Sequence, residues 1–154
     1  MNKILRLALC ALVTMIAGQA SAQTVFDLDA DYATIFPTIT GTSSTTSNDG
    51  DITASTTSIE KDGITLTVSV STSLTANRIW SGSPRLRMYS GTLTITAKNA
   101  TITGIEFVNG KWNTGNTTDS GSLTGTTPAI WSGSADAVVL TIAGNTQLDR
   151  KSVV

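Results

Sequence analysis

The sequence predicts an all-β domain: an antiparallel sandwich of two sheets, jelly-roll or immunoglobulin-like, preceded by an N-terminal signal helix. Serine and threonine are abundant after residue 22, and strong helix formers are sparse there. The branched side chain of threonine favours the pleated, half-exposed surface of a strand. From Ile59 onward, short runs alternate apolar and polar residues, as strands with one buried face do. Turn dipeptides separate these runs at a spacing typical of a sandwich or barrel.

Residues 1–22 have the features of a cleavable secretory signal. Lys3 and Arg6 give a basic start, an apolar run too short to span a bilayer follows, and Ala20-Ser21-Ala22 supplies small residues that a signal peptidase accepts. We predict cleavage before Gln23, and hence a protein that is secreted, cell-surface or periplasmic and has no membrane span after cleavage. The alternative is an uncleaved membrane anchor.

The composition of the remaining chain excludes several function classes. Cleavage removes Cys10, the only cysteine, so no disulfide is available. It also removes Lys3 and Arg6, leaving 8 basic and 11 acidic residues, a net charge of −3 that argues against a nucleic-acid partner. The chain has no histidine, which excludes Ser-His-Asp catalysis and ordinary zinc sites. The strand-borne acid Glu106 alternates outward and has no facing carboxylate of the kind a glycosidase needs, so we predict a non-enzyme without a cofactor.

A loop and a tight turn precede the strand that begins at Ile64. Residues 40–58 are rich in Thr and Ser, and we predict a surface loop with one weak strand. Asp62-Gly63 predicts a hairpin turn that links residues 58–61 to the next strand. That strand has four apolar residues pointing one way and threonine or serine pointing the other: Ile64, Leu66, Val68 and Val70.

The middle of the chain predicts an antiparallel meander. Residues 85–89 and 92–97 flank Ser90-Gly91, and residues 101–108 follow Lys98-Asn99. Each dipeptide is read as the turn between two neighbouring strands.

Two further irregularities are predicted along residues 101–112. Strict alternation cannot point Ile102 and Ile105 to the same face, because they are three residues apart. Gly104 lies between them and predicts a β-bulge whose extra residue would restore one buried face. Asn109-Gly110 then predicts a turn into Lys111-Trp112.

The last third of the chain predicts a long loop and two strands. Residues 115–128 hold few apolar residues and predict a loop. Val138, Leu140 and Ile142 predict one strand, and Gly144-Asn145 predicts a turn into a final strand that begins at Thr146. No helix is predicted after the signal.

The six C-terminal residues, 149–154, can be back-translated into the adapter sequence of short-read libraries followed by a stop codon. We therefore predict that the domain spans residues 23–148, that 149–154 is a non-native tail, and that part of the last strand is missing. The alternative is a native strand that ends in Val153-Val154.

The pentapeptide Ile-Trp-Ser-Gly-Ser occurs twice, at residues 79–83 and 130–134. Each copy precedes an alternating strand, but the residues that follow the two copies share little. We interpret the pair as convergent strand ends followed by Ser-Gly turns, the alternative being an ancestral repeat.

Several strand segments resemble secreted β-sandwich modules of unknown function from Bacteroidota, which are found at the start of larger exported proteins. The resemblance covers most of residues 59–148 and is carried by four segments: Asn77-Arg78-Ile79-Trp80, Arg85-Leu86-Arg87-Met88-Tyr89, Gly91-Thr92-Leu93-Thr94-Ile95 and Ile102-x-x-Ile105-x-Phe107. These motifs are structural, so the resemblance implies no activity. It implies a module of a larger exported protein whose final strand is incomplete here.

One strand carries the best candidate ligand site. Alternation places three polar residues on one face of it, and two more lie close in sequence: Arg85, Arg87, Tyr89, Arg78 and Trp80. Aromatic rings stack on sugar rings, and guanidinium groups bind hydroxyls or carboxylates, so we predict binding of a glycan or other cell-surface polymer. Trp112 and Trp131 are possible additions. The alternative is that the Trp rings belong to the core and the Arg stems pack over neighbours.

Three acids near the start of the predicted domain are a second, lesser candidate. In an extended chain, Asp27, Asp29 and Asp31 share one face, and clustered carboxylates bind Ca²⁺. An EF-hand is excluded because Tyr32 and Thr38 replace its required glycine and glutamate. The alternative to an irregular calcium site is an edge strand that its acids keep soluble.

We therefore expect a secreted, non-catalytic sandwich module that binds a glycan; the alternative is a structural or adhesive spacer without a small-molecule ligand. Geometry separates the two. Binding is favoured if Arg85, Arg87 and Tyr89 line a concave, exposed face with an accessible tryptophan. The spacer is favoured if Trp80 and Trp131 are both buried and the face is flat.

Overall fold

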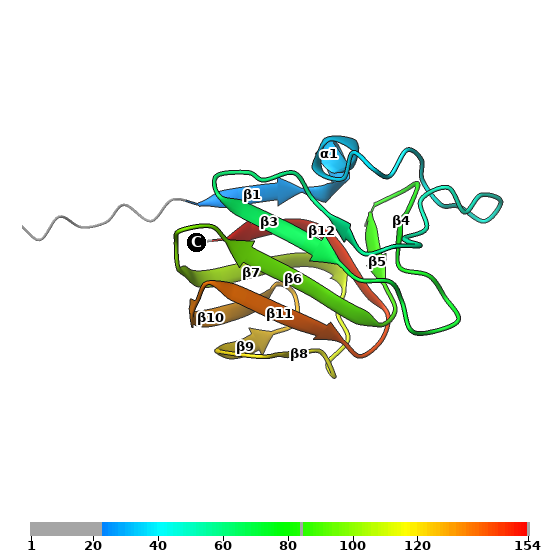
Figure 1. Ribbon diagram of the computed structural model, residues 1–154. Coiled ribbons are helices and arrows are strands. Elements are labelled where there is room, and N and C mark those ends of the chain that lie inside the picture. Colours follow the sequence, from blue (N-terminus) through cyan, green and yellow to red (C-terminus); the bar gives the residue numbers. More distant parts are fainter. Residues whose placement is uncertain (1–22, 84, 154) are drawn as a thin grey trace, which may run out of the picture.

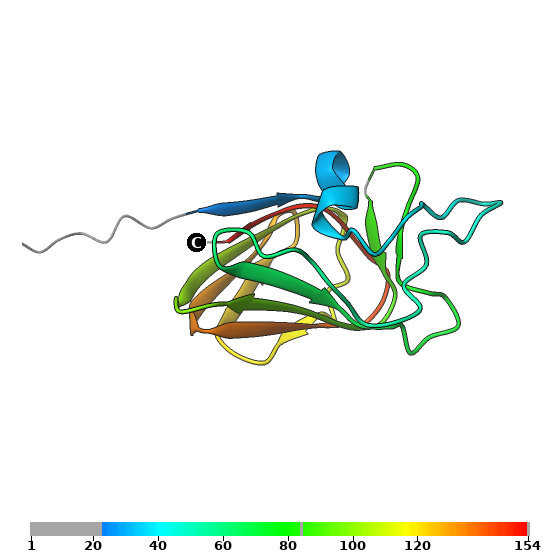
Figure 2. The ribbon, with the colours of Figure 1, turned by 45° about the horizontal axis from the view of Figure 1, so that its top comes forward.

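Two antiparallel sheets pack face to face in the computed structural model, which describes residues 23–153 except residue 84 (Figures 1 and 2). The first sheet has the order β4-β5-β12-β7-β10-β9, and β1 also pairs with β12. Its strands are β1 (Thr24–Asp27), β4 (Arg78–Ile79), β5 (Leu86–Met88), β7 (Ile102–Lys111), β9 (Ser122–Gly125), β10 (Ala129–Ala135) and β12 (Thr146–Val153). The predicted two-sheet sandwich is confirmed. The predicted signal lies outside the described residues and stays a prediction.

The second sheet has the order β2-β3-β6-β11-β8. Its strands are β2 (Thr56–Thr57), β3 (Ile64–Val68), β6 (Gly91–Ala97), β8 (Thr117–Thr118) and β11 (Ala137–Ile142). β2 lies within the predicted loop 40–58, as expected. Residues 115–128 differ from the prediction, because β8 and β9 form there as short edge strands. Both pair with longer strands that are strongly alternating, and this pairing outweighs their own polar composition.

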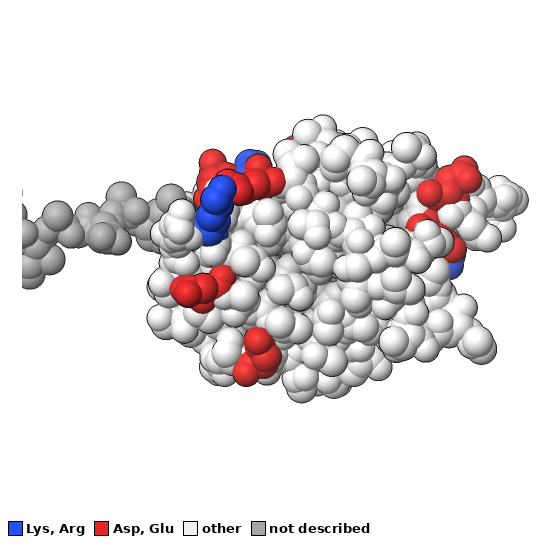
Figure 3. Space-filling model, viewed as in Figure 1, with Lys and Arg blue, Asp and Glu red and all other residues white. Residues whose placement is uncertain are grey.

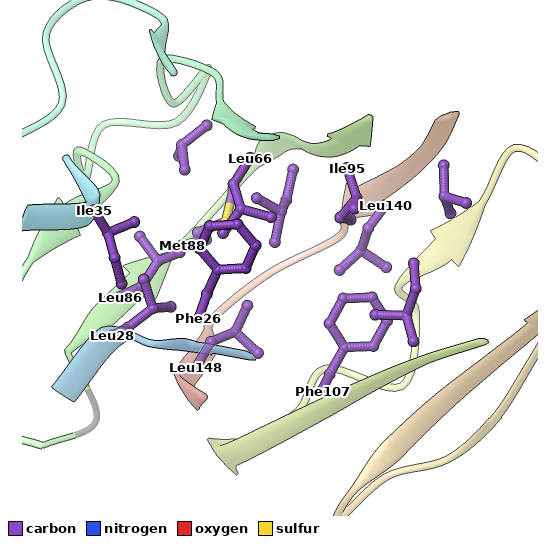
Figure 4. Packing of buried hydrophobic residues seen from close by; sticks show 14 of the residues in the cluster. Phe26, Leu28, Ile35, Leu66, Leu86, Met88, Ile95, Phe107, Leu140 and Leu148 are labelled. Atoms are coloured by element: carbon purple, nitrogen blue, oxygen red, sulfur yellow. The ribbon is translucent and has the colours of Figure 1, made fainter. Parts of the chain in front are cut away.

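The core lies between the sheets and is filled by the inward residues of both (Figure 4). Alternation in β3 buries Ile64, Leu66 and Val68, as the period-two pattern predicts. Val70 is an exception: β3 ends at Val68, and the Val70 side chain is 41% exposed. Across the sandwich, Phe107 and other inward residues of the first sheet are fully buried. Burying one such side chain contributes about 1.5–3 kcal/mol.

The predicted meander is wrong, because the tight connections lead from one sheet to the other. β5 lies in the first sheet and β6 in the second, although only Tyr89-Ser90 separates them. The chain crosses in the same way between β6 and β7, β10 and β11, and β11 and β12. A turn dipeptide reverses the chain without specifying which sheet receives the next strand, and inward alternation looks the same in both sheets.

Asn109-Gly110 lies inside β7, so the predicted turn there is also wrong. Leu148 pairs with Asn109 and the preceding Gln147 pairs with Lys111, so Gly110 is an extra residue in β7. This β-bulge shifts the alternation. Asn109 is buried, whereas Lys111 is exposed.

A register shift also occurs beside Gly104, where a bulge is predicted. Gly104 pairs with Ser132 and Ile102 pairs with Ala135, so the extra residue lies in β10 rather than in β7. Ile102 and Ile105 are both buried, as the prediction requires.

A short helix, α1 (Leu28–Ile35), follows β1, although no helix is predicted there. The Asp27 carboxylate caps it by accepting a hydrogen bond of 3.0 Å from the Ala30 amide. Leu28 and Ile35 are buried in the core and anchor the helix. With only eight residues, this segment gave too short a pattern to distinguish a helix from an acidic strand.

β12 is the last strand in sequence but lies in the interior of the first sheet. It pairs with β5 and β1 along one edge and with β7 along the other. The strand continues from Thr146 through Val153, so the sheet includes residues that we predicted to be a non-native tail. β1 and β7 both pair with this segment as far as Val153. The non-native origin of residues 149–154 stays a prediction.

Candidate functional site

The outer face of β4 and β5 brings together all five predicted ligand-binding residues. Arg78 pairs with Arg87 across the two strands, and the Trp80 amide donates to the Arg85 carbonyl at 2.7 Å. Tyr89 follows directly after β5 and, two residues after Arg87, lies on the same outer face. All five side chains are half-buried, whereas the alternating inward residues Ile79, Leu86 and Met88 are fully buried.

Trp80 forms a cation–π contact with Arg87. The guanidinium carbon lies 4.4 Å from the centroid of the indole, close enough for electrostatic attraction to the ring. The contact fixes the orientation of both side chains, while part of the indole remains open to solvent. Trp80 is thus neither fully buried, as Trp131 is, nor fully exposed.

Arg85 connects β5 to helix α1. Its Nε lies 3.3 Å from a carboxylate oxygen of Asp29, and its guanidinium carbon lies 5.2 Å from the centroid of the Tyr32 ring. Its Nη1 donates to the carbonyls of Trp80 and Ser81 at 3.1 and 3.0 Å. These contacts use much of the hydrogen-bonding capacity of Arg85, so its main role is to position the strand and the helix.

Arg78 is held by Asp51, which comes from the long loop before β3. Their closest atoms, Arg78 Nε and Asp51 Oδ1, lie 3.2 Å apart, and the Ser43 hydroxyl donates to the same oxygen at 2.6 Å. The loop reaches Arg78 because Asp51 forms an isolated antiparallel bridge with it. Sequence reasoning missed Asp51 and Asp29 as partners, since nothing in a Thr-rich loop or an acidic segment indicates which arginine it will meet.

Tyr89 is positioned through its backbone by a buried amide side chain. The Tyr89 amide donates to Asn77 Oδ1 at 2.8 Å, and Asn77 Nδ2 donates to the carbonyls of Ser69 and Ser90 at 3.0 and 2.8 Å. Asn77 is fully buried. Its three hydrogen bonds fix the place where the chain leaves the first sheet.

The other two tryptophans do not join the site. Trp131 in β10 is fully buried, and its Nε1 donates to the Ser120 carbonyl at 2.6 Å. Trp112 is half-buried and packs on Phe107, with ring centroids 5.5 Å apart. Both rings pack in or against the core, which is the alternative to ligand binding that we considered for the tryptophans.

The arrangement assumed for the calcium candidate is wrong. Asp27 ends β1 and caps α1, whereas Asp29 and Asp31 lie in the first turn of the helix. Helical residues two apart are about 200° apart around the axis, so the three carboxylates do not share a face. Across the described residues, no group of three or more potential metal ligands comes together.

A polar groove of about 410 Å³ borders the site. It is lined by residues 38–40, 49 and 51–57. Asp51 contributes to the groove and also pairs with Arg78, so the two surfaces meet at this ion pair. A second hollow of about 310 Å³ lies at the opposite end of the sandwich, beside Asn99 and Asp136.

Comparison with known proteins finds no matching family model, curated protein or solved structure. Within residues 23–153, the structure has no helix of the length and apolarity needed to span a membrane.

Proposed function

We propose that this chain is an exported, non-catalytic β-sandwich module that binds a glycan on the outer face of β4 and β5. The observation that carries the proposal is the Trp80–Arg87 pair: a partly exposed tryptophan with a guanidinium 4.4 Å from the centroid of its indole. A fixed, partly exposed indole offers an apolar surface to a sugar ring, and neighbouring polar groups bind its hydroxyls. Because both side chains are already ordered, little entropy is lost on binding.

The surroundings of this pair support the proposal. Tyr89 lies on the same face, and the groove beyond the Arg78–Asp51 ion pair adds threonine and serine hydroxyls. A ligand longer than one sugar would contact both surfaces. Carboxylates and hydroxyls in such a groove accept hydrogen bonds from, and donate them to, the hydroxyls of a polysaccharide.

The second candidate, a structural or adhesive spacer, also has an observation in its favour. Arg78 and Arg85 are each held by a carboxylate of the same chain, and Trp131 is fully buried. Two of the three arginines thus stabilise the fold, whether or not a ligand exists. The half-exposed Trp80 is what distinguishes the glycan-binding module from the spacer.

A glycan array with the purified protein tests the proposal, with Trp80→Ala and Arg87→Ala as variants and Lys98→Ala as a control. Lys98 is exposed in the turn between β6 and β7, at the end of the sandwich opposite β4 and β5 (Figure 1). We expect binding that both site variants weaken by about fivefold or more, equivalent to about 1 kcal/mol, and that the control retains. Thermal unfolding should show all variants folded. No binding would favour the spacer, and binding that is equal in all four proteins would show that the outer face of β4 and β5 is not the site.

A further inference from the structure

The register of the first sheet aligns five polar residues in one row across its strands. Asp51 pairs with Arg78, Arg78 with Arg87, Arg87 with Gln147, and Gln147 with Lys111. Neighbouring strands lie about 4.8 Å apart, so the row extends about 19 Å perpendicular to the strands. We call these five residues the transverse row.

All members of the transverse row are at least partly exposed. Asp51, Arg78, Arg87 and Gln147 are half-buried and Lys111 is exposed. Lys111 joins the row only because of the bulge at Gly110; without the extra residue, alternation would place Lys111 on the side of the buried Asn109.

The transverse row is more charged than the outer face of the second sheet. The outward residues of β3, β6 and β11 in the second sheet are uncharged, mostly threonines, and the middle of that face is uncharged in Figure 3. In contrast, the transverse row holds three cations and one carboxylate. Arg78 is neutralised by Asp51 at 3.2 Å, whereas Lys111 has no ion-pair partner among the described residues.

Two other carboxylates lie near the row, and only Asp29 is paired with a cation. Asp149, farther along β12, accepts a hydrogen bond of 2.8 Å from the Ser83 hydroxyl, and Asp29 pairs with Arg85. The local excess of positive charge contrasts with the net charge of −1 for the whole sequence. The row and Asp149 together hold three cations and two carboxylates, and this remaining positive charge favours a ligand that carries negative charge.

We propose that the transverse row selects an acidic polysaccharide, which lies across the strands with its carboxylates toward Arg87 and Lys111 and one sugar ring against the part of Trp80 that Arg87 leaves uncovered. This inference rests on the proposed glycan-binding function and names its substrate class. Gln147, between the two cations, binds a hydroxyl of the same polymer; its Nε2 already donates to Asn145 Oδ1 at 3.0 Å, so Oε1 acts as the acceptor. A single half-exposed indole fits a sugar ring better than a nucleic acid, whose bases need several stacking surfaces.

Binding of polygalacturonate and of neutral dextran to the purified protein, measured by affinity electrophoresis, tests the proposal. Lys111→Glu is compared with Lys98→Glu, which changes the net charge equally but lies in the turn between β6 and β7. We expect polygalacturonate to bind more tightly than dextran and its affinity to fall as salt is added. Lys111→Glu should weaken this binding by about fivefold or more, and Lys98→Glu by less than about twofold.

The possible outcomes separate this inference from the proposed function. If dextran binds as tightly as polygalacturonate and its binding depends on Trp80, the glycan-binding function stands and the acidic substrate class is wrong. If the two lysine variants weaken binding equally, the transverse row is not the site. Equal affinity for single-stranded DNA of matched charge would show unselective polyanion binding and overturn the proposal. If neither polysaccharide binds, both proposals fail.

Discussion

The pentapeptide Ile-Trp-Ser-Gly-Ser adopts opposite orientations in its two copies. In the first copy, Ile79 is fully buried and Trp80 is half-exposed; in the second, Ile130 is 44% exposed and Trp131 is fully buried. The first copy ends the two-residue edge strand β4, whereas the second lies inside β10, between β7 and β9. Strand pairing, rather than the local sequence, therefore decides which of two adjacent apolar residues enters the core.

This difference supports the interpretation of the two copies as convergent. An ancestral repeat keeps the same residues in its core, because a shift by one residue moves every side chain of a strand to the other face. It also explains why one tryptophan belongs to the candidate site and the other to the core. Substitutions at matched positions measure how far the two copies differ.

The largest difference is expected for the tryptophans. Trp131→Ala removes a fully buried ring and its hydrogen bond to Ser120, and should lower the free energy of unfolding by about 3–5 kcal/mol. Trp80→Ala removes a half-exposed ring and should cost about 1 kcal/mol or less. Urea unfolding of both variants measures this difference; similar losses would contradict the opposite orientations.

The isoleucines should show the reverse order. Ile79→Ala leaves a cavity in the core and should destabilise the protein by about 2–4 kcal/mol. Ile130→Ala, at a largely exposed position, should cost less than about 1 kcal/mol. The midpoint of urea unfolding provides the comparison, and the interpretation fails if Ile130→Ala is the more damaging substitution.

The two glycines should differ by a smaller amount. A Cβ atom at Gly133 would lie 2.5 Å from Trp131 Cζ2 and 3.2 Å from Gly121 Cα, so Gly133→Ala forces the buried ring to shift, at about 1–3 kcal/mol. At Gly82 the nearest atom, Trp80 Cδ1, is 3.9 Å away, and Gly82→Ala should change stability by less than about 0.5 kcal/mol. Thermal unfolding at one protein concentration distinguishes the two; equal melting temperatures would show that the Trp131 packing is loose.

The smallest effect is expected at the cation–π contact. Arg87→Ala should cost about 1 kcal/mol or less, because the contact lies at the surface. It should also expose more of the Trp80 ring while leaving Trp131 buried. Acrylamide quenching of tryptophan fluorescence measures the exposure of the Trp80 ring. The measurement uses a Trp112→Phe background, in which only Trp80 and Trp131 fluoresce, and adding Trp80→Phe identifies the part of the signal that comes from Trp80. An unchanged quenching constant would mean that Arg87 does not cover the indole.

The sequence was sufficient to predict which residues face the core within the long strands. Ile64, Leu66 and Val68 in β3, and Val138 and Leu140 in β11, are all buried as the alternation predicts. The same alternation placed Arg85, Arg87 and Tyr89 on one outward face, so the sequence also predicted which residues of this strand would form the candidate site.

The pairing of strands was not predictable in the same way. The residues around Ser90-Gly91 fit a hairpin within one sheet as well as a connection between two sheets. Asn109-Gly110 is likewise compatible with both a β-bulge and a turn. The ion pairs of the site depend on contacts between distant segments: Asp51 and Arg78 are 27 residues apart. Such partners follow from the topology, which single-strand patterns do not contain.

The interior position of β12 has a consequence for how the protein folds. Among the described strands, only β12 joins β5 and β1 to β7, so the first sheet stays divided until this last strand is added. Most of its pairings join segments far apart in sequence, which slows folding because long loops must close first. The chain therefore completes the first sheet only after β12 has been synthesised.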